Sequence, residues 1–174
     1  MKAKSYFSLR SLHTRAMMAA FFYLFASIIT PAANAQSTRG NEYNKPDQLL
    51  DALHDNAAAA NWDDYFNLFG PNSIFIGTDT SEVWTVPAFK RFALETKGWK
   101  YTVKSRQMQT GNTGDVIWFH ELLWNKSYGE TRGTGTLIKT DKGWKIAQYS
   151  LTIPVPNAIA KKVVTVIKDH QKSQ

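Results

Sequence analysis

Residues 73–84 read Ser-Ile-Phe-Ile-Gly-Thr-Asp-Thr-Ser-Glu-Val-Trp, and the other elements that we expect are arranged around this stretch. Ile74 and Ile76 flank Phe75 in an apolar strand pattern, and residues 77–81 supply the glycine and short polar side chains that a sharp reversal needs. The stretch therefore predicts a hairpin. Its two carboxylates, Asp79 and Glu82, stand beside Trp84 and either line the mouth of a pocket or decorate the turn.

Three helices are expected around this hairpin. Residues 46–60 begin with a proline in the first turn and continue with leucines at helical spacing. Residues 61–69 place Trp62, Tyr65, Phe66 and Phe69 on one face, with Asn61 as N-cap and Gly70-Pro71 as the stop. After the hairpin, Thr85 is expected to cap a third helix with Phe89, Phe92 and Ala93 facing inward.

The second half of the chain changes to strand periodicity. Residues 99–108, 116–124, 131–139 and 144–152 predict four long antiparallel strands in succession. The segment 116–124 is apolar on both faces except for His120 and Glu121, which is typical of a strand covered on both sides. Glu121 shares its parity with Ile117, Phe119 and Leu123, so we expect its carboxylate to be buried.

The two ends of the chain read differently from the centre. Residues 1–35 carry four basic residues, an apolar run at 16–29 and Ala33-Asn34-Ala35, which predict a cleaved secretory signal; an uncleaved anchor is the alternative. Residues 36–45 are polar and are expected to form a flexible leader. Residues 159–174 predict a basic amphipathic helix or tail, which packs on the sheet or a sister subunit, or touches an anionic membrane or a partner.

Composition narrows the possible functions. Cleavage before Gln36 leaves 139 of the 174 residues, enough for one domain, and lowers the net charge from +7 to +3 by removing four basic residues. Basic residues are spread along the chain, which argues against a nucleic-acid partner. The chain has no cysteine, and its histidines show no metal-ligand spacing, so we expect neither a metal site nor a cofactor. The expected location is the periplasm or the medium.

The order of elements, with several short motifs, resembles the SnoaL-like branch of the nuclear transport factor 2-like superfamily. The motifs are Asp64-Tyr65, Ile76-Gly77-Thr78-Asp79, Glu82-Val83-Trp84, Trp118-Phe119 with Glu121, Arg132-Gly133-Thr134-Gly135, Gly143-Trp144-Lys145-Ile146 and Pro156-Asn157. They lie within residues 46–158. The resemblance implies an α+β cone in which three N-terminal helices pack in a strongly curved antiparallel sheet around an apolar cavity. It also implies a homodimer formed through the outer face of the sheet.

The resemblance also directs attention to the polar groups of the cavity. Relatives often place histidines and a serine on alternate positions of the last strand, where this chain has Gln148, Ser150 and Thr152. None of these is a base near neutral pH. Glu121 is expected either to pair with Arg132 on the next strand, to orient a ligand, or to act as an acid or base. The hairpin should lie near the open end of the cavity, which favours Glu82 and Trp84 as ligand contacts and leaves Asp79 as a turn residue.

The leading hypothesis is a secreted, non-enzymatic domain that binds a small, mostly apolar ligand in an aromatic cavity. The expected ligand contacts are Trp62, Tyr65, Glu82, Trp84, Trp118, Glu121 and Arg132. One alternative is a proton-transfer enzyme, an isomerase, dehydratase or cyclase, which uses Asp79, Glu82 or Glu121 with a raised pKa. Another is a dimeric protein-interaction module.

Overall fold

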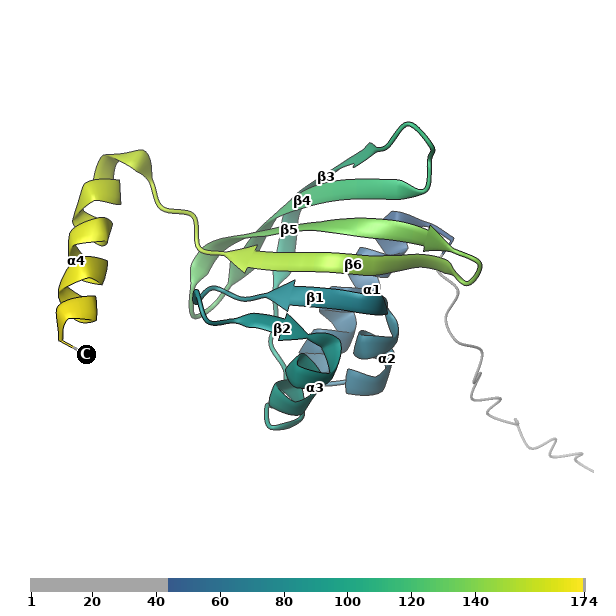
Figure 1. The fold of residues 1–174 in the computed structure, drawn as a ribbon, viewed down its shortest axis with the longest axis horizontal. Coiled ribbons are helices and arrows are strands. Elements are labelled where there is room, and N and C mark those ends of the chain that lie inside the picture. The colour runs from purple at the N-terminus through teal and green to yellow at the C-terminus, as the bar shows by residue number, and fades with distance from the viewer. Residues whose placement is uncertain (1–43, 174) are drawn as a thin grey trace, which may run out of the picture. The chain divides into compact units, whose positions relative to one another are not determined.

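The computed structural model describes residues 44–173, so the expected signal segment and most of the leader lie outside the described residues. The chain follows the predicted order of elements (Figure 1). The helices are α1 (Pro46–Ala59), α2 (Trp62–Asn67), α3 (Val86–Leu94), the 3-10 turn η1 (Asn157–Ile159) and α4 (Ala160–Lys172). The strands are β1 (Phe69–Ile76), β2 (Val83–Thr85), β3 (Thr102–Thr110), β4 (Val116–Asn125), β5 (Gly129–Thr140) and β6 (Gly143–Thr152).

All six strands form one sheet in the order β2-β1-β6-β5-β4-β3. The four long strands pair antiparallel as expected, and β1 pairs parallel with β6. The predicted hairpin is present, with Phe75 opposite Trp84 in the register of β1 and β2. Helices α1, α2 and α3 gather on one side of the sheet (Figure 1). The fold is therefore the expected α+β arrangement of three N-terminal helices and a curled sheet.

The sheet is bent where one strand contains an extra residue. Lys104 is extra in β3, because Val103 pairs with Leu123 and Ser105 pairs with Leu122. The pairing of β5 and β6 shifts in the same way next to Ala147. Such bulges bend a strand, and the side chains that follow them change faces.

The core lies between the helices and the inner face of the sheet. Leu49, Leu50, Leu53 and Ala57 of α1 are buried, which is the predicted apolar stripe of this helix. Pro46 begins α1, and Asp47 in its first turn suits the positive end of the helix dipole.

Three local predictions were wrong. Helix α2 ends at Asn67, and Phe69 already belongs to β1, where it pairs with Ile146; Gly70 and Pro71 therefore lie inside a strand. Phe92 is 45% exposed, because it lies near the end of α3 beside a cavity rather than in the core.

The third correction concerns β4, which is covered on one face only. Ile117, Phe119 and Leu123 are buried, whereas Trp118 and Trp124 on the other face are each 49% exposed. The helices occupy one side of the sheet, so within the described residues the second apolar face of this strand stays open to solvent.

Candidate functional site

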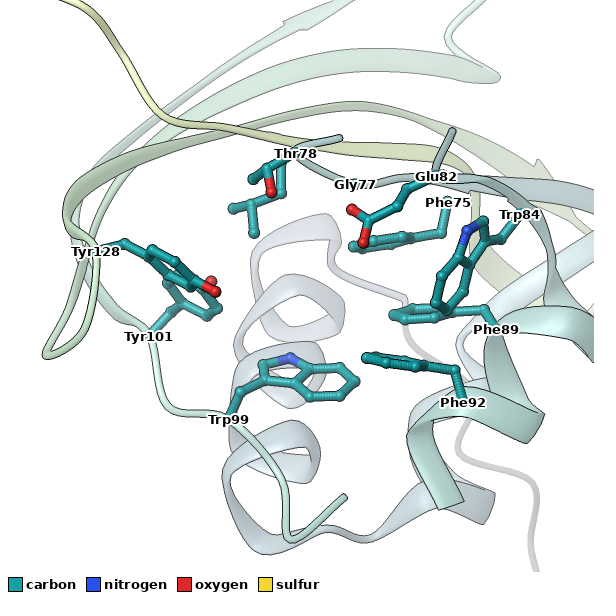
Figure 2. A pocket seen from close by; sticks show the side chains of 11 residues that line it. Phe75, Gly77, Thr78, Glu82, Trp84, Phe89, Phe92, Trp99, Tyr101 and Tyr128 are labelled. Carbon is teal, nitrogen blue, oxygen red and sulfur yellow. The ribbon is translucent and has the colours of Figure 1, made fainter. Parts of the chain in front are cut away.

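A cavity of about 200 Å³ opens between the β1–β2 hairpin, helix α3 and the strands behind them. Phenylalanine, tryptophan and tyrosine rings form most of its wall, and a few polar groups stand at its rim (Figure 2). We call this space the aromatic cavity; its lining residues are Phe75, Gly77, Thr78, Glu82, Trp84, Phe89, Phe92, Trp99, Tyr101, Tyr128 and Leu151.

The aromatic wall is a continuous set of ring contacts. Phe75 stacks on Phe89 with centroids 3.9 Å apart, and Trp84 meets Phe92 edge-on at 4.7 Å. Trp99 stacks on Phe89 at 5.7 Å. These rings come from the hairpin, from α3 and from the segment before β3, so the wall exists only when the three segments fold together.

The polar rim is positioned by the hairpin turn. The Glu82 carboxylate accepts a hydrogen bond of 3.2 Å from the backbone N–H of Asp79, and it points into the cavity (Figure 2). A Cβ at Gly77 would collide with that carboxylate, so glycine is needed for its position. Asp79 itself accepts bonds from the backbone and hydroxyl of Ser81, which lower the pKa of its exposed carboxyl. Asp79 is therefore the turn residue that the sequence predicted.

A smaller space of about 20 Å³ lies next to the aromatic cavity and has four lining residues in common with it, Phe75, Trp99, Tyr101 and Leu151. His54, Tyr65 and Tyr149 complete its wall together with Leu53 and Ala57. A void of this size holds about one water molecule. We call it the inner void. Its wall includes the polar side chains of His54 and Tyr149.

Behind the inner void lies a buried charge cluster centred on Glu121, whose side chain is fully buried. Its Oε2 accepts a bond of 3.1 Å from the Tyr149 hydroxyl and lies 3.0 Å from His54 Nε2. Its Oε1 accepts a bond of 2.7 Å from Arg106 Nε. Arg106 in turn donates to Asp51 at 2.8 Å and to Asp47 at 3.3 Å, which ties α1 to β3.

The cluster fixes the ionisation of Glu121. Burial by itself raises the pKa of this carboxyl, but the hydrogen bonds and charges of His54 and Arg106 outweigh burial and bring the pKa below its ordinary value. The carboxylate is therefore ionised at neutral pH, and His54 Nε2 carries the hydrogen that it shares with Oε2. Burial, together with the nearby Glu121 charge, raises the pKa of Tyr149 well above its ordinary value, so Tyr149 remains a donor.

The seven sequence-predicted contacts fall into separate places. Glu82 and Trp84 line the aromatic cavity, and Tyr65 lines the inner void. Trp62 is buried in the core against Trp99, with ring centroids 4.8 Å apart. Glu121 lies behind the inner void.

Trp118 and Arg132 lie on the outer face of the sheet, away from both spaces. The predicted pair of Glu121 with Arg132 was wrong, because Glu121 lies opposite Gly133 in the sheet register and Arg132 lies opposite Leu122. Gly133 leaves room for the Tyr149 hydroxyl, which would collide with a Cβ there. Arg106 provides the cation instead.

The bulges explain which residues the sequence pattern missed. Alternation from Trp99 predicts that even-numbered residues of β3 face solvent, but the extra residue Lys104 turns Arg106 inward, opposite Glu121. In β6 the shift beside Ala147 turns Tyr149 inward. Gln148, Ser150 and Thr152 are thus on the outer face, in register with outer-face residues of β5. His54 could have been found from its helical spacing to Leu50 and Ala57.

No group of three or more metal-ligating side chains occurs within residues 44–173. In the same range, no helix is long and apolar enough to cross a membrane.

Comparison with known proteins points to one family. A family model described as SnoaL-like domain matches residues 47–156. Among curated proteins, none matches this sequence. A candidate aromatic ring hydroxylase from Novosphingobium aromaticivorans superposes with a TM-score of 0.55 at 14% identity, covering 63% of this chain and 87% of its own.

Two further solved structures have the same fold. A candidate scytalone dehydratase from the same organism gives a TM-score of 0.54 at 10% identity, covering 63% of this chain and 81% of its own. An NTF2-like protein of unknown function from Pseudomonas putida gives a TM-score of 0.51 at 12% identity, and the match covers 64% of this chain and 85% of the Pseudomonas chain. At these identities the likeness shows the fold alone.

Proposed function

Since the chain belongs to the SnoaL-like domain family, we propose that it binds a small, mostly apolar ligand in the aromatic cavity and does so without catalysing a reaction. The observation that supports this most is the cavity itself, about 200 Å³ of open space walled by stacked rings and bordered by a single carboxylate. Concave, largely apolar spaces with few polar groups are the usual form of small-molecule sites.

The volume limits the size of the ligand. A protein cavity of about 150 Å³ accommodates benzene. The aromatic cavity is somewhat larger, so it suits one six-membered ring with a short substituent, and its open side lets a longer substituent extend into solvent. The flat faces of Phe75, Trp84 and Trp99 favour a planar ring, because offset and edge-on ring contacts add to the gain from burial.

The rim adds a requirement on ligand polarity. The Glu82 carboxylate only accepts hydrogen bonds when ionised, so it selects a hydroxyl or amino group on the ligand. Burial raises the pKa of Tyr101 to about 12, so its phenol remains protonated at neutral pH and is available as a donor. A phenol or a ring with a small amine meets both conditions.

Binding is tested by titrating the protein with a panel of one-ring compounds while its tryptophan fluorescence and heat of binding are recorded. Trp84→Ala should weaken binding about 2- to 10-fold, since one aromatic contact contributes about 0.5–1.5 kcal/mol. Trp118→Ala, a tryptophan on the outer face, is the matched control and should bind as the unaltered protein does. If no compound changes the fluorescence or releases heat, the proposal is wrong.

A second candidate function is proton transfer, and the pairing of His54 with Glu121 favours it. The alternative foreseen from the sequence required a carboxyl with a raised pKa, whereas the pKa of Asp79 and that of Glu121 are lowered. Histidine is the commonest general base in enzymes, and a hydrogen bond from one ring nitrogen to a buried carboxylate orients the imidazole. His54 lines the inner void, where one water or the tip of a ligand fits.

This candidate is tested with any compound that binds. The protein is incubated with the compound in heavy water, the sample is returned to ordinary water to remove deuterium from oxygen and nitrogen, and deuterium that remains bound to carbon is measured by mass spectrometry. Proton transfer predicts exchange that His54→Gln abolishes while the affinity changes little. Binding without exchange in the unaltered protein rules out proton transfer and leaves the binding function intact.

The proposal also includes export to the periplasm or the medium, which rests on the basic and apolar pattern of residues 1–35. Its test is the N-terminal sequence of protein recovered from the periplasm, with Gln36 expected as the first residue. Recovery of the uncleaved chain from the membrane fraction would mean that the segment is an anchor.

Dimerisation through the outer face of the sheet is the remaining part of the proposal. Trp118 and Trp124 expose about half of their surface on that face, where a second copy would cover them. Light scattering should give the mass of a dimer, and Trp118→Asp should give that of a monomer. A monomer in the unaltered protein contradicts this part alone.

A further inference from the structure

Helix α4 presents an apolar stripe that nothing in the described part of the chain covers. Val163, Val166 and Ile167 recur at the i, i+3, i+4 spacing that places side chains on one helix face, and Ile159, the last residue of η1, precedes Val163 by four residues. Ile159, Val166 and Ile167 are 47%, 62% and 49% exposed, and no residue of the helix is buried. An isolated helix of this length is marginal in water, so a partner for the stripe is expected.

The opposite face of α4 is basic. The helix contains four lysines and one aspartate, a net charge of +3 apart from the histidine. Lys161, Lys168 and Lys172 follow i, i+7, i+11 spacing and lie across the helix from the apolar stripe. The fourth lysine, Lys162, lies to one side of the polar face. A helix with a valine and isoleucine stripe and a lysine face has the pattern of interfacial helices on anionic lipid.

The sheet of the same chain is not a suitable partner for α4. The helix makes its main contact with η1, and an extended segment joins it to β6 (Figure 1). On the outer face of the sheet, Arg132 and Lys145 accompany Glu130, so a second copy would offer no acidic surface to a basic helix. Charge therefore disfavours docking of α4 on the sheet of a sister subunit.

The segment before the helix extends the apolar surface. Ile153 and Val155 are 44% and 43% exposed and alternate with Pro154 and Pro156, which cannot donate backbone hydrogen bonds. This segment and the stripe of α4 together form one exposed apolar run on a chain end that is otherwise basic. With 13 residues, α4 is too short to cross a bilayer, for which about 20 apolar residues are needed.

We propose that α4 is a membrane-surface anchor that lies flat on an anionic lipid surface, with its apolar stripe among the acyl chains and its lysines among the headgroups. Lysine stems are long enough to keep their ammonium groups at the headgroup level while the valines and isoleucines are buried. The anchor holds the cavity-bearing domain at the lipid surface, and its function is independent of whether the aromatic cavity binds a ligand.

The test uses a chain that begins at Gln36, which contains all of the described residues and lacks the apolar N-terminal run. It is sedimented with phosphatidylcholine vesicles and with vesicles in which a third of the lipid is phosphatidylglycerol. Binding to the anionic vesicles is expected, weaker at high salt and much weaker to the neutral vesicles. Absence of binding to the anionic vesicles overturns the proposal.

Two sets of variants identify the binding face. Each lysine near an anionic surface contributes about fivefold to affinity, so Lys161→Glu with Lys168→Glu should reduce binding at least about 25-fold. Lys142→Glu, on the exposed turn between β5 and β6, is the matched charge control and should change binding little. Ile167→Asp should also abolish binding. Equal loss with the control variant would mean that general basicity, not α4, drives the binding.

The competing occupant, a second copy of the chain, gives a different result. If Ile167→Asp converts a dimer to a monomer in light scattering and leaves vesicle binding unchanged, α4 is a self-association surface and the proposal is wrong. Because no residue of α4 is buried and Lys142 is exposed, all of these variants should keep the thermal stability of the domain, which circular dichroism checks.

Discussion

The buried charge cluster gives the strongest test of the structure through one substitution, Arg106→Met. The change removes the cation that donates to Glu121 Oε1 and leaves the fully buried carboxylate with His54 and Tyr149. Methionine fills a similar volume with an apolar side chain, so packing changes little. The carboxylate, by contrast, loses the charge-assisted bond of 2.7 Å from Arg106 Nε.

The expected loss follows from the burial of both partners. Breaking a buried ion pair from one side costs about 3–5 kcal/mol, because a charge is left without compensation. Glu121 keeps two hydrogen bonds, which places the loss near the lower end, about 3 kcal/mol. For a domain that spans residues 44–173, a loss of about 3 kcal/mol lowers the melting temperature by roughly 10 °C.

The assay is urea and thermal unfolding at neutral pH, followed by circular dichroism. Arg132→Met is the matched control, since Arg132 is exposed on the outer face, and it should change the free energy of unfolding by less than about 0.5 kcal/mol. The double variant Arg106→Met with Glu121→Gln removes both charges, keeps an amide oxygen as acceptor for Tyr149 and His54, and should recover part of the loss. The reasoning is refuted if Arg106→Met costs under 1 kcal/mol or if the double variant is less stable than Arg106→Met alone.

Other predictions concern the pH dependence of stability, steric clashes at two glycines and the titration of Tyr101. Because the pKa of Glu121 is lowered in the folded protein, the ionised carboxylate stabilises the fold at pH values above its ordinary pKa of 4.5, and this stabilisation is lost as the pH falls through the pKa of the folded protein. The difference in free energy of unfolding between the unaltered protein and Glu121→Gln, measured by urea titration, should therefore shrink at acid pH. A constant difference would contradict this. Gly133→Ala should cost about 1–3 kcal/mol, because its Cβ meets the Tyr149 hydroxyl, whereas Gly70→Ala, with ordinary contacts from 3.4 Å outward, should cost less in the same unfolding assay. Absorbance titration should show that Tyr101→Phe removes a phenol with a midpoint of about 12; a lost midpoint near 10 would place Tyr101 in solvent.

Much of the fold could be predicted from short-range patterns. The alternation around Phe75 and the polar turn after it identified the hairpin, and the leucine spacing of α1 identified a helix and its buried face. Local geometry fixes such features, because side chains repeat every two residues in a strand and every 3.6 in a helix. The resemblance to the SnoaL-like domain, and not these patterns, led to the expectation that Glu82 and Trp84 line a cavity, and both do.

The candidate site was predicted less completely, because its members come from segments far apart in the chain. The aromatic wall needs Phe75, Phe89 and Trp99 to meet, and the charge cluster needs Arg106 and Glu121 to face each other across two strands. Nothing in the local sequence around Arg106 distinguishes it from a solvent-facing residue of β3.

The order of the elements, the buried parity of Glu121 and the turn at Asp79 could be predicted without the structure, since all of these depend on neighbours in the chain. That Arg106 and Tyr149, and not Arg132, surround the Glu121 carboxylate depends on the folded sheet. The physical reason is the bulges in β3 and β6: one extra residue reverses which side chains face inward, and its position depends on how the sheet closes around the helices.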